Sequence, residues 1–176
     1  GMGPNRDNHG TEVDSKWTRS GEPLAERSLT LRTGDREDLE DVVDIEREAH
    51  PTPWNRDIFE KELALDWSHF WLVEDRSEEG GEVAAFLIIW TVHDEIHILN
   101  IAVAAKHRRR GIASDLITEI VETGEAADYS FITLEVRETN TAAIELYRGL
   151  GFEEMGRREE YYADTGEAAL LMQRLL

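Results

Sequence analysis

The stretch His97-Ile-Leu-Asn-Ile-Ala-Val-Ala-Ala-Lys-His-Arg-Arg-Arg-Gly-Ile-Ala-Ser114 decides the fold of this chain. Ile98 to Val103 is an apolar run of strand length, rich in β-branched residues. Lys106 to Arg110 is a basic loop, and Gly111 then opens a segment, Ile112 to Val121, whose apolar residues recur at helical spacing. A helix that starts at a glycine turn leaves backbone N–H groups unpaired, and these donors bind anions together with the helix dipole. The stretch therefore predicts a cradle for phosphate groups.

The overall charge supports this interpretation. The chain has 38 Asp and Glu residues against 19 Lys and Arg and a formal net charge of −19, yet this loop gathers Lys106, Arg108, Arg109 and Arg110. A positive cluster in so acidic a chain indicates an anionic ligand, although the motif alone leaves open a basic surface turn that caps an ordinary helix. The acidity disfavours binding to nucleic acid or to anionic membranes. It also predicts a cytoplasm rich in salt, as in a halophile, with a merely acidic mesophilic protein as the alternative.

The composition bounds the class of protein. The 176 residues suffice for one domain with a substantial core, and the absence of cysteine excludes disulfides, thiolate metal sites and a cysteine nucleophile. No apolar run reaches the length of a membrane span, and the N-terminus lacks the apolar core of a signal peptide, so we expect a cytoplasmic protein. His93, His97 and His107 lack paired ligand spacing on one element, so we expect no metal site. Gly1 before Met2 is typical of a protease scar from an expression tag.

The order of elements predicts a mixed α/β sheet. Residues 1–26 are polar and without periodicity, so we expect a disordered or loosely docked tail before a single domain, 27–176. The patterns predict strands over 28–32 (at an edge), 70–73, 83–92, 96–103, 130–136, 152–162 and 168–176, and helices over 39–49, after Asn55, over 112–121 and over 140–150. The strand–helix–strand unit in the middle implies one parallel pair within a mostly antiparallel sheet.

Several motifs, in order, resemble one family. Arg108-x-x-Gly111-x-Ala113, between a strand and a helix, resembles the acetyl-CoA signature of the GNAT acetyltransferases. Four further matches resemble the ribosomal-protein alanine N-acetyltransferases and the archaeal protein N-terminal acetyltransferases within that superfamily: Ala49-His50 with Pro53-Trp54, Leu134-Glu135-Val136-Arg137, Asn140 and Ala143 to Tyr147 with Leu150-Gly151-Phe152, and Tyr161-Tyr162-Ala163-Asp164. The resemblance covers about residues 29–176. The chain departs from it at Ala105, where proline is frequent, and at Ala113, where glycine is commoner.

The resemblance implies acetyl-CoA as the co-substrate. The pyrophosphate would lie on the backbone N–H groups of a six-residue turn: Arg109, Arg110, Gly111, Ile112, Ala113 and Ser114. Arg108 and its neighbours would face the adenosine phosphates. The pantetheine arm would pair with the backbone of Ile101, Ala102 and Val103 like an added strand, which requires the parallel partner strand to splay away. Asn140 would hold the arm from the other side, and a plain helix cap is its alternative.

The same resemblance guides the catalytic candidates. Glu135 shares a strand face with Thr133 and Arg137 and is the candidate general base, while a surface pair with Arg137 is its alternative. His97 lies at the start of the neighbouring strand and is a second candidate base or proton relay, because imidazole titrates near neutral pH. Tyr147 is the candidate acid for the departing thiolate, with a core packing role as its alternative. A backbone N–H near Val103 would hold the oxyanion.

We expect a transferase that acetylates the N-terminal α-amine of a protein or peptide, with a ribosomal protein among its substrates. At pH 7 about one-seventh of a free α-amine is neutral, against less than about one-thousandth of a lysine, so a moderate base suffices. Pro53 and Trp54 with Tyr161 and Tyr162 would wall a peptide groove, and ordinary aromatic packing is the alternative for these four. A small-amine acetyltransferase and a non-catalytic acyl-CoA-binding module are the competing functions. We expect a monomer or weak dimer that contacts neither nucleic acid nor membrane.

Overall fold

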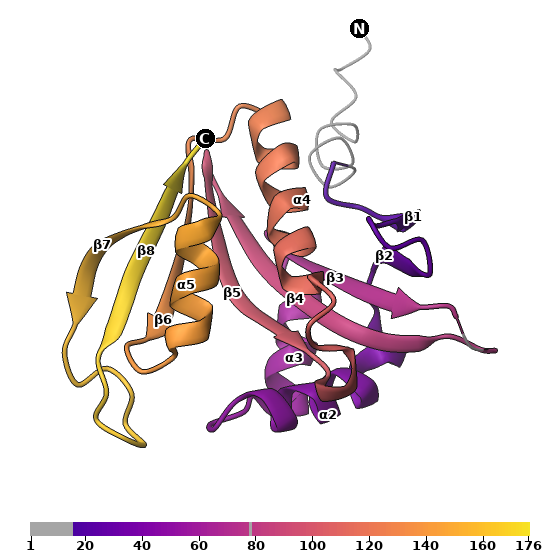
Figure 1. Cartoon of the computed structure of the whole chain (residues 1–176), viewed down its shortest axis with the longest axis horizontal. Helices are drawn as coiled ribbons and strands as arrows, with labels where there is room; N and C mark the ends of the chain where they lie inside the picture. The colour runs from indigo at the N-terminus through magenta and orange to yellow at the C-terminus, as the bar shows by residue number, and fades with distance from the viewer. Residues whose placement is uncertain (1–15, 78) are drawn as a thin grey trace, which may run out of the picture.

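The computed structural model describes residues 16–77 and 79–176. It contains an eight-stranded sheet in the order β1-β2-β3-β4-β5-β6-β8-β7 (Figure 1). The strands are β1 Ser20–Pro23, β2 Leu29–Thr33, β3 Ser68–Asp75, β4 Glu82–Val92, β5 Glu95–Val103, β6 Phe131–Arg137, β7 Glu153–Arg158 and β8 Ala169–Leu175. The helices are α2 Leu39–Ala49, α3 Arg56–Leu63, α4 Ile112–Ala126 and α5 Thr141–Gly149, with 3-10 turns η2 Arg36–Asp38 and η3 Ala105–His107.

One parallel pair interrupts an otherwise antiparallel sheet. β1 to β5 pair antiparallel in sequence order, and β6, β8 and β7 do so on the other side. β5 and β6 run parallel, but their pairing covers only Glu95–Ile98 against Phe131–Leu134. Beyond that point the two strands diverge, as Figure 1 shows between β5 and the group of β6, α5, β7 and β8. The predicted mixed sheet with one splayed parallel pair is confirmed.

Two hydrophobic cores cover the two faces of the sheet. On one face, apolar side chains of α4 and α5 pack on strand residues that include Ile96, Ile98 and Leu134. On the other face, α2 and α3 pack on strand residues that include Phe86 and Ala102. β4 lies at the centre and is buried from Ala84 to Ile89, as its continuous apolar run predicted.

A bulge in β5 changes which residues face each core. Ile88 of β4 is paired with Asn100, and the next residue, Ile89, is paired with Ile98, so Leu99 is extra. Because one extra residue shifts the alternation of side chains, Asn100 faces α2 together with Ala102. The bulge lies just beyond Ile98, where β5 leaves β6.

The N-terminal segment differs from the predicted tail over residues 16–26, while residues 1–15 lie outside the described residues. β1 pairs with β2, so β2 is not the edge strand that its pattern predicted. The Trp17 ring is 1% exposed and packs against three rings, those of His69, Trp71 and Tyr129. The buried Trp17 ring and the pairing of β1 with β2 thus dock this segment on the domain, although its average composition is polar.

In the part of the chain that the structure describes, no helix combines the length and apolarity that a membrane span requires.

Candidate active site

The turn into α4 leaves backbone donors free. Gly111 is the N-cap residue of α4, has a left-handed φ of 73°, and provides no side-chain cap. Arg109, two residues earlier, also has a positive φ, of 65°. A Cβ placed on Gly111 would meet no atom within 4 Å, so the turn can be approached closely from outside. Successive N–H groups in such a turn and the positive end of a 15-residue helix suit a phosphate anion, and the geometry therefore fits the predicted cradle.

The basic side chains of this loop divide into two kinds. Arg110 is held by carboxylates on both sides, with Nη1 2.7 Å from Asp75 Oδ2 and Nε 3.0 Å from Glu26 Oε2. The Arg110 hydrogen bond keeps the pKa of the Asp75 carboxyl well below its usual range. Arg108 and Arg109 are exposed. The side chain of Arg110 thus anchors the loop, and the exposed guanidinium groups of Arg108 and Arg109 are the ones that can face phosphates.

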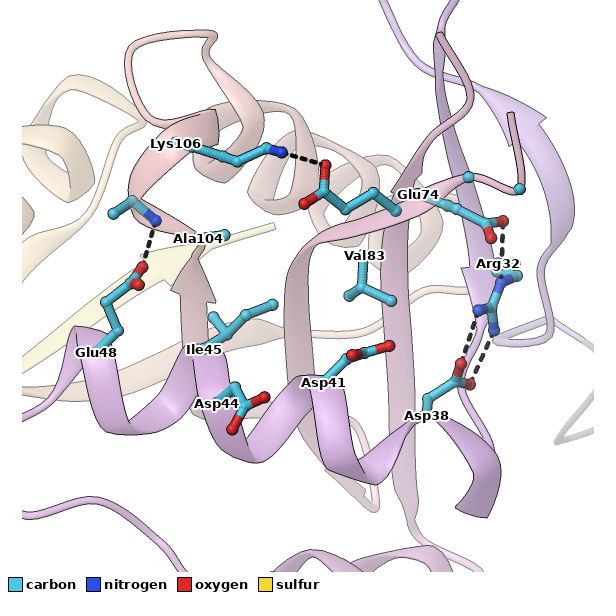
Figure 2. Close-up of a pocket in the computed structure, with 14 residues that line it drawn as sticks. Arg32, Asp38, Asp41, Asp44, Ile45, Glu48, Glu74, Val83, Ala104 and Lys106 are labelled. Atoms are coloured by element: carbon cyan, nitrogen blue, oxygen red, sulfur yellow. Dashed lines mark hydrogen bonds and ion pairs between the residues drawn. The ribbon is translucent and has the colours of Figure 1, made fainter. Parts of the chain in front are cut away.

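A second set of contacts fixes the loop from the side of α2. The Ala105 N–H donates to Glu48 Oε1 at 2.5 Å, and Lys106 Nζ lies 2.8 Å from Glu82 Oε2 (Figure 2). A hollow of about 550 Å³ lies here, and Asp41 and Asp44 of α2 are among the residues that line it (Figure 2). Because carboxylates dominate its lining, this hollow does not suit an anion, and it contains none of the predicted cofactor or substrate residues.

The far half of β5 has a free backbone edge. Ile101, Ala102 and Val103 pair with β4 on one side. On the other side the pairing with β6 has already ended at Ile98. Among the described residues, no strand covers this edge, so an extended ligand arm can pair with it as predicted.

The helix α5 brings two predicted residues to the other wall of the split. Tyr147 is 7% exposed, and its ring lies 5.7 Å from that of Phe152. Burial raises the pKa of Tyr147 to about 12, so the hydroxyl keeps its proton at neutral pH, as a proton donor must. The Oδ1 of Asn140 accepts from the Ala143 N–H at 3.3 Å, which shows the helix-cap alternative and leaves its amide N–H groups for a ligand.

Glu135 lies where β6 parts from β5. It follows Leu134, the last β6 residue that pairs with β5, and it faces away from the α4 side of the sheet. Its Oε1 lies 3.5 Å from Arg158 Nη2. The hydrogen bond that the Tyr161 hydroxyl makes to Glu135 raises the pKa of Tyr161. The structure thus brings Glu135 and Tyr161 together.

The alternative surface pair between Glu135 and Arg137 is not formed. Arg137 donates to both oxygens of Asp164 at 3.0 Å, and its guanidinium lies 4.0 Å from the centre of the Tyr162 ring. These contacts direct the Arg137 side chain to the β7–β8 loop and away from Glu135.

His97 lies in the paired part of β5, before the split begins. Its Nδ1 is 2.7 Å from Thr133 Oγ1, and its Nε2 is 3.1 Å from Glu95 Oε2. Both ring nitrogens are therefore engaged, and the geometry favours Glu135 over His97 as the group that meets a substrate.

Two loops meet over the open end of the split. Thr52 Oγ1 donates to Asp164 Oδ2 at 2.7 Å, which joins the α2–α3 loop to the β7–β8 loop. The hydrogen bond from Arg137 lowers the pKa of Asp164 to about 2, so the carboxylate stays charged. The predicted groove residues lie on these loops: Pro53 is exposed, Trp54 packs on Phe59 at 5.3 Å, and Tyr161 packs on Tyr162 at 5.1 Å.

A buried polar cluster beside the split was missed by sequence reasoning. Glu46 is 1% exposed and accepts a hydrogen bond from the Asn100 amide, and His50 Nε2 lies 3.0 Å from Asn100 Oδ1 and 3.2 Å from Glu46 Oε1. Burial raises the pKa of the Glu46 carboxyl, and the opposing effects of His50, Asn100 and the Trp54 backbone N–H do not cancel this. Two signals could have found it: a glutamate on the apolar face of the 39–49 helix, and an asparagine inside an apolar strand.

A helix N-terminus without a side-chain cap and a strand edge opened by a split fit an acyl-coenzyme A, and the carboxylate and the protonated tyrosine beside them fit a transferase. No group of three or more His, Asp or Glu side chains that could hold a metal ion occurs among the described residues. A sequence profile described as the Acetyltransferase (GNAT) family matches residues 39–152. The chain therefore belongs to the GNAT family of acetyltransferases.

Individual relatives agree with this assignment. The chain is 34% identical over 145 residues to the [ribosomal protein bS18]-alanine N-acetyltransferase of Escherichia coli (strain K12), a match that spans 81% of this chain and 95% of the relative. The crystal structure of the Escherichia coli ribosomal-protein-S18-alanine N-acetyltransferase has a TM-score of 0.75 and 32% identity, covering 84% of this chain and 93% of that one. Arabidopsis thaliana NAA60 in complex with acetyl-CoA has the same fold, with a TM-score of 0.76, 22% identity and coverage of 84% and 98%. The chain is an N-acetyltransferase with acetyl-CoA as its acyl donor.

Proposed function

We propose that this enzyme acetylates the N-terminal α-amine of a protein, and its relatives named as alanine N-acetyltransferases of ribosomal protein bS18 support this. One observation carries the proposal: Glu135 lies at the start of the split, on the face of the sheet away from α4, with Tyr161 of the β7–β8 loop bonded to its carboxylate. The Thr52–Asp164 hydrogen bond joins the two loops that would line the groove. Such a groove suits the end of a peptide chain.

The residues at the split supply the proton transfers that amide formation needs. Acetyl-CoA provides the thioester that serves as acyl donor. Glu135 accepts a proton from the attacking amine, and the Tyr147 hydroxyl gives a proton to the leaving sulfur. Arg108, Arg109 and the N–H groups at the start of α4 hold the phosphates. A carboxylate base suits an α-amine better than a lysine, because a far larger fraction of the α-amine is neutral at pH 7.

Three acceptors offered to the purified enzyme with acetyl-CoA test this proposal. One is a short peptide with a free N-terminal alanine and one internal lysine, the second is the same peptide with a blocked N-terminus, and the third is a small polyamine. We expect mass spectrometry to find acetylation of the first peptide alone, at its N-terminal nitrogen. Acetylation of the polyamine alone would establish the small-amine alternative, and binding of acetyl-CoA without turnover on any acceptor would establish the non-catalytic alternative.

We also propose that the enzyme works in a cytoplasm rich in salt. The support for this is the composition, with 38 Asp and Glu against 19 Lys and Arg and a sequence pI near 4.6.

A further inference from the structure

The Glu46–Asn100–His50 cluster is an unusual feature to bury without a function. Glu46 and Asn100 are 1% and 8% exposed, and they are joined by a hydrogen bond from the Asn100 amide to Glu46 Oε2. A carboxylate withdrawn from water is costly unless its partners compensate for it. An apolar residue at position 46 would leave the Asn100 amide and the Trp54 N–H without their acceptor, so the variants below separate a structural role of the cluster from a catalytic one.

The cluster lies on the same face of the sheet as Glu135, across the split from it. Asn100 is two residues beyond Ile98, the last β5 residue that pairs with β6. Glu135 is one residue beyond Leu134, the last β6 residue that pairs with β5. Leu134 belongs to the core on the α4 side, so Glu135 faces the opposite side, where Asn100 contacts α2. The two groups therefore flank the start of the split from its two strands.

The contacts of His50 fix the tautomer of its ring. Nε2 makes a hydrogen bond of 3.0 Å with Asn100 Oδ1 and lies at ion-pair distance, 3.2 Å, from Glu46 Oε1. An imidazole nitrogen that bonds to an amide oxygen must carry the hydrogen, so Nδ1 of the neutral ring has a lone pair. The side chain is 36% exposed, and no partner of Nδ1 occurs among the described residues. A carboxylate behind one nitrogen and an open second nitrogen is the arrangement of an oriented general base.

The position of His50 places this base at the substrate side of the split. His50 is the C-cap residue of α2, and the α2–α3 loop begins with it. Two residues later, Thr52 bonds to Asp164 of the β7–β8 loop. The imidazole thus lies at the start of the α2–α3 loop, one of the two loops that would line the proposed peptide groove.

We propose that His50 removes the first proton from the acceptor's α-ammonium group, with Glu46 and Asn100 as its positioning residues. This inference rests on the proposed function. In the step, an N–H bond of the ammonium breaks, the electron pair stays on nitrogen, and the proton bonds to His50 Nδ1 and later leaves to water. The neutral amine then attacks, a C–N bond forms and the C–S bond breaks. Glu135 takes the second proton from nitrogen, and Tyr147 protonates the sulfur.

Two peptides and a conservative variant test the step. His50→Gln keeps an amide that can bond to Glu46 and Asn100 but cannot take a proton. The peptides are identical except that one begins with alanine and the other with trifluoroalanine, whose fluorines leave its amine neutral at the assay pH. We expect His50→Gln to lower kcat/KM by about sevenfold at pH 7 on the alanine peptide, because only about one-seventh of its amine is already neutral, and to leave kcat/KM on the trifluoroalanine peptide unchanged, with an unchanged KM for acetyl-CoA.

The control is His69→Gln, because His69 is also half-buried, bonds to Thr91 Oγ1 at 2.9 Å, and lies on β3 away from the split. It should leave both rates unchanged. If His50→Gln lowered kcat/KM equally on the two peptides, the base role of His50 would be overturned, while the proposed function would stand. Inactivity of the wild type on both peptides would overturn the proposed function and this step with it.

A second variant keeps the inference testable if His50→Gln does not fold. Glu46→Gln preserves the shape and the contact with Asn100 but removes the charge that stabilises the imidazolium. We expect the same selective loss on the alanine peptide, smaller in size, together with a melting temperature that is unchanged or raised, because a buried charge has been removed. A fall in melting temperature with no selective loss would instead show that the cluster is structural.

Discussion

Glu135 is the residue on which the proposed chemistry depends. Replacing it by glutamine keeps the shape of the side chain and its contact with Tyr161 but removes its capacity to accept a proton. We expect the turnover of Glu135→Gln on a peptide with a free N-terminus to fall by about 10²- to 10⁴-fold. Calorimetry should give an almost unchanged affinity for acetyl-CoA. The control is Glu153→Gln, an exposed carboxylate at the start of β7, which should retain full turnover.

If Glu135→Gln kept near wild-type turnover at neutral pH, the base role would pass to another group. His97 would be the residue to examine, although both of its ring nitrogens are already engaged.

The buried hydroxyl of Tyr147 predicts how turnover depends on pH. Burial raises its pKa to about 12, so the hydroxyl remains protonated across the ordinary assay range, and loss of that proton cannot cause a fall in rate below about pH 11. Tyr147→Phe should slow turnover while preserving the fold, because only the hydroxyl is lost. High pH should partly relieve the defect of Glu135→Gln, since hydroxide can take the proton that Glu135 would otherwise accept, but not that of Tyr147→Phe. Rate–pH profiles of both variants measure this difference, and equal relief in the two would contradict the acid role.

At the scale of elements, the turn into α4 is the part where a single substitution should most affect acetyl-CoA binding. Gly111→Glu would place a carboxylate in the phosphate cradle, where space exists for it but where its charge repels the ligand. We expect acetyl-CoA affinity to fall by several kcal/mol, as measured by calorimetry. The positive φ of Gly111 adds some backbone strain.

A matched control separates strain from charge. Gly80 also has a positive φ, and a Cβ there would meet no atom within 4 Å. Gly80→Glu therefore introduces the same strain and the same charge in the β3–β4 turn, and it should leave acetyl-CoA affinity unchanged. Unchanged affinity in Gly111→Glu as well would remove the cradle assignment.

How far the sequence predicts each element depends on whether its cause is local. The turn at Gly111, the helix that follows it and the helix after Asn55 were predictable, because each depends on residues within a few positions. The splay of β5 from β6 could be expected only through the family resemblance. Trp17 was assigned to a tail because its burial depends on ring contacts with residues more than fifty positions away.

The site follows the same rule. Glu135 was found because its neighbours along the strand alternate, but its partners, Arg158 and Tyr161, come from the following hairpin. The pairing of Glu46 with Asn100 joins residues 54 positions apart, and that of Thr52 with Asp164 joins residues 112 apart. No periodicity in the sequence predicts such pairs.

At the scale of the molecule, the acidic surface predicts a response to salt. Carboxylates gather along α2 and the β3–β4 hairpin around the hollow in Figure 2. Burial and the neighbouring charges of Asp44, Glu40 and others raise the pKa of Asp41, so ionisation of these groups together opposes folding. Both melting temperature and turnover should rise from low to molar salt, as screening weakens the repulsion. A melting temperature that is flat across that range would contradict the salt-rich cytoplasm while leaving the enzymatic proposal intact.

The most direct test of the central claim is the N-terminal acetylation of proteins in the source organism with and without this enzyme. Mass spectrometry of a deletion strain should find one or a few proteins, a ribosomal protein among them, that have lost their N-terminal acetyl group. Re-expression of the wild type should restore the modification, and re-expression of Glu135→Gln should not. An unchanged set of acetylated N-termini in the deletion strain would contradict the account.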